Sequence, residues 1–85
     1  MTFNILIVDD EKNIRTGLGK ALELDGYRVL LASDGQEGLD TLQEEEVDLI
    51  IADLKMPRLS GEELLRRVVD TYPTIPVIIL TGHGT

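Results

Sequence analysis

Two short apolar runs end in acidic residues, and this pattern limits the possible folds of the chain more than any other feature. Residues 5–8 run directly into Asp9 and Asp10. Residues 47–52, interrupted only by Asp48, run in the same way into Asp53. Apolar runs this rich in Ile, Val and Leu are typical of strands that are buried on both faces of a parallel sheet. Parallel strands end at one edge of the sheet, where open α/β sheets bind their ligands, so we expect the three Asp side chains to meet there.

Helical patterns separate the apolar runs. Residues 12–24 carry apolar side chains at helical spacing, and Gly26 then supplies the left-handed conformation that ends many helices. Capping-box patterns, Ser-x-x-Gln at residues 33–36 and Ser-x-x-Glu at residues 60–63, predict where the next two helices begin. The sequence thus predicts helices over about 12–24, from the cap at 33 to about 45, and over 61–72, between strands at 5–8, 27–32, 47–53 and 77–80.

Strands and helices alternate along the chain and are joined by short loops. This order favours a three-layer α/β fold in which right-handed crossovers build one parallel sheet. A chain of 85 residues forms one domain at most. Its last strand, Val77 to Leu80, is too apolar for an exposed sheet edge, because such an edge pairs with other chains. We therefore expect a fold that is incomplete at its C-terminal end, and a homo-oligomer formed by strand or segment exchange.

The composition excludes several classes of function. Sixteen acidic against eight basic residues give a net charge of −8, which opposes direct binding to nucleic acid, since that affinity comes largely from Lys and Arg. No apolar run approaches the roughly 20 residues that a membrane span requires, and no basic and apolar leader precedes the first strand. We expect no membrane association and a cytoplasmic location. The absence of Cys excludes disulfides and thiolate metal sites.

A cluster of three carboxylates needs a partner of opposite charge. Two carboxylates about 4 Å apart repel by roughly 4 kcal/mol at an effective dielectric constant of about 20, so the cluster must bind a cation or take up protons. Mg²⁺ is suitable, because it prefers oxygen ligands and keeps several water molecules. A simpler interpretation is that the acidic pair caps the following helix, since Asp is a favoured N-cap residue. Taken alone, Asp9 and Asp10 favour the cap, and beside Asp53 they favour a metal site.

The order of these features resembles the receiver domain of bacterial response regulators. The resemblance covers the whole chain, and it rests on the ordered set of residues rather than on any one of them. The set comprises Asp9 and Asp10 after the first strand, Asp53 after the third, Met56 and Pro57 beyond it, Gly61 at the start of the next helix, and Thr81 at the end of the fourth strand. Residues 53–57 and 80–84 look most similar to receivers attached to transcriptional activators. The fold that the resemblance implies is flavodoxin-like.

The resemblance also implies a chemistry. Asp53 would be the phosphoacceptor of a two-component system, taking a phosphoryl group from a histidine kinase. Mg²⁺ would bind directly to Asp10, to Asp53 and to the backbone carbonyl of Lys55, with Asp9 acting largely through water. Thr81 would contact the phosphoryl group and switch the surface beyond it. The output domain, which by the same resemblance binds DNA, is absent from the chain, as are the Lys and the aromatic residue of the family's fifth strand.

The alternative function is that of a Mg²⁺-dependent phosphatase with an Asp nucleophile. Such phosphatases use an Asp-x-Asp motif, which this chain lacks. Lys55 stands where the second Asp would follow Asp53, and Glu11 stands there after Asp9. A nucleotide or flavin site is disfavoured as well, because the first turn is acidic and has no glycine-rich phosphate loop. The motifs therefore favour a regulatory phosphoacceptor over an enzyme.

Overall fold

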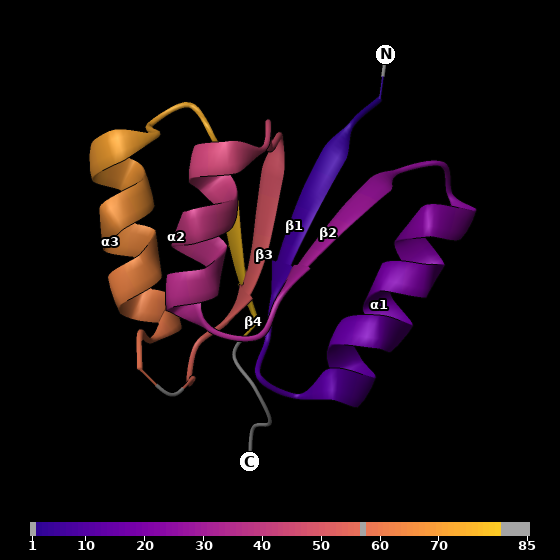
Figure 1. The fold of residues 1–85 in the computed structure, drawn as a ribbon, viewed down its shortest axis with the longest axis horizontal. Helices are drawn as coiled ribbons and strands as arrows, with labels where there is room; N and C mark the ends of the chain where they lie inside the picture. Colours follow the sequence, from indigo (N-terminus) through magenta and orange to yellow (C-terminus); the bar gives the residue numbers. More distant parts are fainter. Residues whose placement is uncertain (1, 57, 81–85) are drawn as a thin grey trace.

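The computed structural model describes residues 2–56 and 58–80, in which strands and helices alternate along the chain (Figure 1). The strands are β1 (Asn4–Val8), β2 (Arg28–Ala32), β3 (Leu49–Asp53) and β4 (Val77–Leu80). The helices are α1 (Lys12–Leu24), α2 (Gly35–Glu44) and α3 (Gly61–Thr71). None of these helices is long and apolar enough to cross a membrane. Each predicted strand and helix is present, and each boundary lies within about two residues of its predicted place.

The described strands form one parallel sheet of order β2-β1-β3-β4. Val8, at the end of β1, pairs with Ala32 of β2 on one side and with Ala52 of β3 on the other. Figure 1 shows α1 on one face of the sheet and α2 and α3 on the other. The predicted three-layer parallel α/β fold is confirmed, with β1 between two neighbours.

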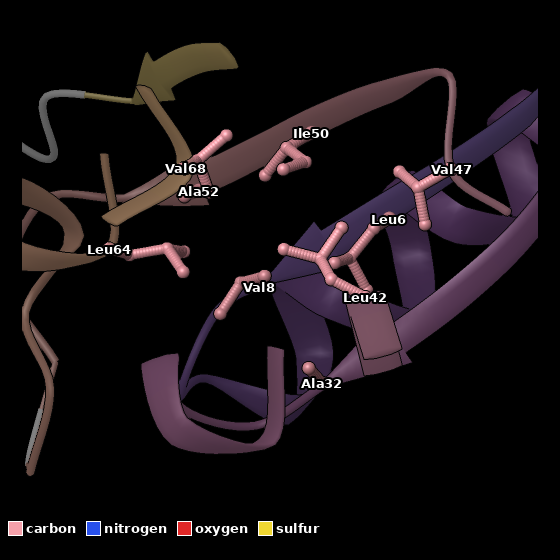
Figure 2. Packing of buried hydrophobic residues seen from close by; sticks show 9 residues of the cluster. All are labelled: Leu6, Val8, Ala32, Leu42, Val47, Ile50, Ala52, Leu64 and Val68. Carbon is pink, nitrogen blue, oxygen red and sulfur yellow. The ribbon is translucent and has the colours of Figure 1, made fainter. Parts of the chain in front are cut away.

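Two apolar cores hold the three layers together, and β1 contributes to both. Ile5 and Ile7 face α1, where they pack with Ile51 and with partly buried residues of that helix. Leu6 and Val8 face α2 and α3. A strand that serves both cores is apolar without alternation, which explains the first apolar run of the sequence. The larger core, drawn in Figure 2, comprises Leu6, Val8, Ala32, Leu42, Val47, Ile50, Ala52, Leu64 and Val68.

The third strand begins two residues later than the sequence predicts, at Leu49. The backbone N–H of Asp48 donates to the carbonyl of Asn4 at 2.9 Å, and the Asp48 carboxylate accepts from the N–H of Asn4 at 2.8 Å. The side chain of Asp48 thus occupies a position that a strand carbonyl would otherwise take. Val47 is buried in the larger core although it lies outside β3. The apolar pattern therefore extends beyond the strand that it helped to predict.

The start of α2 corrects one predicted cap. The N-cap residue is Asp34 and not Ser33: the Asp34 carboxylate accepts from the backbone N–H of Glu37 at 2.9 Å. The Glu37 carboxylate in turn accepts from the N–H of Ser33 at 2.7 Å. The predicted box is therefore wrong by one residue, because Asp34 and Glu37 have the same three-residue spacing as Ser33 and Gln36, and Asp is as good an N-cap residue as Ser. At α3 the predicted cap is confirmed, with the Ser60 hydroxyl accepting from the N–H of Glu63 at 3.2 Å.

Gly61, the first residue of α3, lies directly against the end of β3. Its N–H donates to the carbonyl of Leu54 at 2.9 Å. A Cβ atom added to Gly61 would overlap the backbone carbonyl of Asp53. The space for a side chain is filled by backbone, which has no rotamer with which to move aside. Glycine at this position is what allows α3 to begin beside Asp53.

We expect Gly61→Ala to lower the free energy of unfolding by about 1–3 kcal/mol, the usual cost of forcing extra atoms into a packed site. Gly17→Ala is the matched control, because Gly17 lies in α1 with no atom within 4 Å of an added Cβ. That substitution should raise the free energy of unfolding by about 0.5–1 kcal/mol through helix propensity. Urea unfolding followed by circular dichroism measures both. Equal effects of the two substitutions would contradict the close approach of α3 to β3.

Candidate metal centre

Three carboxylates converge at the carboxyl edge of the sheet, which is the lower edge in Figure 1. Asp9 and Asp10 follow β1, and Asp53 is the last residue of β3. These two strands are neighbours, and their last paired residues are Val8 and Ala52. One carboxylate oxygen from each Asp lies within 4.8 Å of the other two. The parallel pairing of β1 and β3 is therefore what brings the predicted cluster together.

The three carboxylates differ in their access to solvent. Asp9 is buried, with 3% of its surface exposed, while Asp53 is half-buried and Asp10 is exposed. One Asp9 oxygen accepts from the backbone N–H of Glu11 at 2.8 Å, which fixes the turn into α1. Glu11 itself is the N-cap residue of α1, and its side chain makes no capping bond. Asp9 therefore shapes the turn before α1, but neither member of the acidic pair is the cap of that helix.

Burial raises the pKa of the Asp9 carboxyl above its ordinary value. The hydrogen bond from the N–H of Glu11 lowers this pKa, because it favours the charged form. The negative charges of Asp53, Asp10 and Glu11 raise it further. The net direction is upward, which means that the folded site disfavours a third negative charge. A cation placed among the carboxylates would reverse that preference.

The donor set fits Mg²⁺. All three side chains offer hard carboxylate oxygens, the ligands that Mg²⁺ prefers, at distances near 2.1 Å. Two oxygens on opposite sides of such an ion lie about 4.2 Å apart, and the three carboxylate oxygens here all lie within 4.8 Å of one another. Asp10 and Asp53 are accessible enough to carry water on the ion as well. The site therefore has the chemistry and the dimensions of a divalent cation site.

Lys55 and Thr81 complete the predicted site. Lys55 follows β3 in an exposed loop, and among the described residues no donor reaches its carbonyl. Its predicted role as a backbone ligand stays a prediction. Leu80, the last described residue of β4, pairs with Asp53. Thr81, predicted to contact the phosphoryl group, lies outside the described residues.

Sequence reasoning missed two polar contacts near the site. The guanidinium of Arg15 donates to the backbone carbonyl of Asp9 at 2.8 Å, which ties α1 to the turn that carries the acidic pair. The guanidinium of Arg58 contacts the Asp34 carboxylate at 2.8 Å, which ties the loop after β3 to the start of α2. A basic residue one turn into the first helix could have signalled the first contact. No local pattern signals the second, because it joins two separate loops.

Comparisons with known proteins identify the family. A family model described as the response regulator receiver domain matches residues 5–85. The transcriptional regulatory protein GlrR of Escherichia coli K12 is 43% identical over 82 residues, which cover 96% of this chain and 18% of GlrR. The chain spans less than two fifths of the length of the curated relatives that it matches.

Two solved structures are similar to this chain in fold as well as in sequence. A receiver domain from Clostridium thermocellum has a TM-score of 0.90 and 45% identity, over 96% of this chain and 67% of that one. The response regulator TrrA from Thermotoga maritima, solved in complex with Mg²⁺ and BeF, has a TM-score of 0.92 and 35% identity, over 98% of this chain and 72% of that one. A family match over residues 5–85, the parallel fold and the edge cluster of carboxylates agree. The chain belongs to the response regulator receiver domain family.

Proposed function

We propose that Asp53 is the phosphoacceptor of this receiver, taking a phosphoryl group from the phosphohistidine of a histidine kinase with the help of Mg²⁺. The observation that carries the proposal is the convergence of Asp53 with Asp9 and Asp10 within 4.8 Å at the carboxyl edge of the sheet. Asp53 is half-buried, so a donor can approach it, whereas Asp9 is closed off by burial. Exposure thus favours Asp53 over Asp9 as the group that reacts.

The proposed transfer requires little beyond position and charge. A carboxylate oxygen of Asp53 attacks phosphorus, a P–O bond forms as the P–N bond to the histidine breaks, and the imidazole nitrogen keeps the electron pair and takes a proton. Asp10, Asp53 and the carbonyl of Lys55 would hold Mg²⁺ directly, and Asp9 would act through water. When bound, the ion would neutralise charge on the phosphoryl oxygens. Phosphoryl transfer is accelerated mainly by positioning and charge stabilisation, so this set of groups is sufficient.

The relatives support a regulatory role. GlrR is named a transcriptional regulatory protein, and the chain spans 18% of it. We infer that the phosphoryl group on Asp53 signals to an output domain outside this chain, and that this domain acts on transcription. Thr81 would carry the signal away from the site by contacting the phosphoryl group. Transient contact with a histidine kinase, a cytoplasmic location and the expectation that residues 1–85 are the first portion of a longer receiver stay predictions.

Incubation of the chain with Mg²⁺ and acetyl phosphate should add one phosphoryl group, detected by intact mass and mapped by peptide mass after borohydride reduction of the acyl phosphate. We expect Asp53→Asn to abolish the adduct, because an amide is a poor nucleophile. Asp70→Asn, on the exposed surface of α3, is the matched control and should leave the adduct unchanged. An adduct that survives Asp53→Asn would remove the proposed role of Asp53. Turnover of a generic phosphate ester that depends on Asp53 would instead favour the phosphatase.

Rising pH should lower the stability of the metal-free chain, and Mg²⁺ should raise it. The pKa of Asp9 is raised on folding, so its contribution to stability is present at low pH and is lost as the pH rises through the pKa of the folded state. We expect the metal-free chain to lose stability over that range and millimolar Mg²⁺ to restore it. Asp9→Asn should flatten the pH dependence and reduce the gain from Mg²⁺. Thermal unfolding over a pH series, with and without Mg²⁺, measures both effects, and identical curves would contradict the shared site.

We also propose that this chain self-associates through β4. Among the described residues β4 pairs only with β3. Ile78 of β4 is 48% exposed, on the face of the sheet that carries α1, and α1 makes its main contacts with β1 and β2. An apolar edge of this kind favours pairing with a second copy. The apolar run Val77 to Leu80 carries no charge that would oppose such pairing.

Light scattering over a dilution series should show a dimer or larger oligomer that dissociates on dilution. We expect Ile78→Lys to shift the chain toward monomer, because a charge at a sheet edge opposes pairing. Leu24→Lys is the matched control, since Leu24 is 87% exposed at the end of α1, away from β4. A stable monomer of the unsubstituted chain at every concentration would contradict the proposal.

A further inference from the structure

The loop between β3 and α3, described over residues 54–56 and 58–60, is held at its base and again at Arg58 and Leu59. At the base, the N–H of Gly61 donates to the carbonyl of Leu54 at 2.9 Å, so the two ends of the loop meet. Near the tip, the guanidinium of Arg58 contacts the carboxylate of Asp34 at 2.8 Å. Next to this contact, the backbone of Leu59 packs so closely on Gly35 that a Cβ atom there would overlap it. The loop is therefore clamped onto the N-terminus of α2.

Asp34 is the buried half of this clamp. Its side chain is only 6% exposed, and both of its oxygens have a partner. One oxygen accepts from the backbone N–H of Glu37 and caps α2, and the other contacts Arg58. A buried carboxylate oxygen without a partner is costly, so Asp34 favours the loop conformation that keeps the guanidinium of Arg58 in place, although the Arg58 side chain is itself 73% exposed.

Arg58 provides a second sign that the loop is constrained. It has a φ of 66°, which places a residue other than Gly in the left-handed region. Such a conformation persists only where the surroundings hold it in place. The Asp34 contact is the polar interaction found for the Arg58 side chain among the described residues. The ion pair and the positive φ are therefore two independent signs that the backbone at Arg58 is held in one conformation.

Lys55 lies inside this loop, between the base at Leu54 and the clamp at Arg58. We propose that the Asp34–Arg58 ion pair is a positioning device that holds residues 58–60 against α2, orders residues 54–56 before metal binds and so presents the Lys55 carbonyl to Mg²⁺. This inference rests on the proposed metal site. Neither Asp34 nor Arg58 would touch the ion; both would act indirectly, by fixing the loop that carries Lys55.

The experiment is a Mg²⁺ titration of the ¹⁵N-labelled chain, with the dissociation constant taken from the amide shifts of Asp10 and Lys55. Arg58→Gly removes the cation and also relieves the positive φ, so any loss cannot come from added strain. In Arg58→Gly we expect the dissociation constant for Mg²⁺ to rise about threefold to tenfold. This is less than the 10–100-fold typical for loss of a residue that hydrogen-bonds to a metal-binding group. Arg58→Lys keeps a cation and should recover most of the affinity. Arg66→Gln, which breaks an exposed contact to Glu63 in α3, should have no effect.

Amide hydrogen exchange in the metal-free chain supplies a readout that does not depend on Mg²⁺. Exchange at Lys55 and Met56 should be faster in Arg58→Gly than in Arg66→Gln. Asp34→Asn keeps an oxygen for the α2 cap and should speed exchange as Arg58→Gly does. If both residues act through one ion pair, exchange in the double variant should be no faster than in the single variant that exchanges faster. Unchanged exchange and a dissociation constant within twofold in Arg58→Gly would overturn the positioning role alone. A parent chain whose Asp10 and Lys55 amide shifts do not change with Mg²⁺ would overturn the metal site and the affinity claim together. Faster exchange in Asp34→Asn, which leaves the loop sequence unaltered, would still show that the ion pair orders the loop.

Discussion

β1 is the strand on which the geometry of the site depends. Its residues Ile5 to Val8 are at most 2% exposed, and the strand pairs with β2 on one side and β3 on the other. Burying each of these large apolar side chains contributes about 1.5–3 kcal/mol, so the strand cannot slip or rotate without losing both cores. Asp9 and Asp10 therefore leave the sheet at a fixed point, next to the end of β3. The carboxylates are held together by the cores beneath them and not by attraction to one another.

The fold holds three carboxylates together although their negative charges are unfavourable there. The raised pKa of Asp9 shows that the folded site resists its own negative charge. Each contact around the cluster involves the backbone: the N–H of Glu11 donates to the Asp9 carboxylate, the Arg15 guanidinium donates to the Asp9 carbonyl, and the N–H of Gly61 donates to the Leu54 carbonyl and closes the loop after Asp53. These contacts fix the positions of the acids and leave Asp10 and Asp53 open to solvent. Repulsion that is held in place in this way becomes affinity for a divalent cation.

The fold and the acidic cluster follow from local patterns, whereas the loop contacts do not. The apolar residues of 5–8 and 47–53 predict buried parallel strands. Because parallel strands end at the same edge of the sheet, this prediction alone brings Asp53 close to Asp9. The cap of α2 was misplaced because Ser33 and Asp34 are both good N-cap residues and only their side-chain geometry separates them. Gly38 lowers the helix propensity of α2, yet in the fold it lies against Val8, where a Cβ atom would be 3.1 Å from that side chain. The packing role of Gly38 and the contact of Asp34 with Arg58 both join elements that are distant in sequence, so no local pattern predicts them.

The contact between Gly61 and the carbonyl of Asp53 has a mechanical consequence. Because backbone meets backbone there, nothing compressible separates the last peptide of β3 from the first turn of α3. A displacement of the Asp53 peptide toward the helix must push the helix, and a shift of the helix must press on that peptide. The position of the Asp53 peptide and the orientation of α3 are therefore mechanically coupled at this one contact.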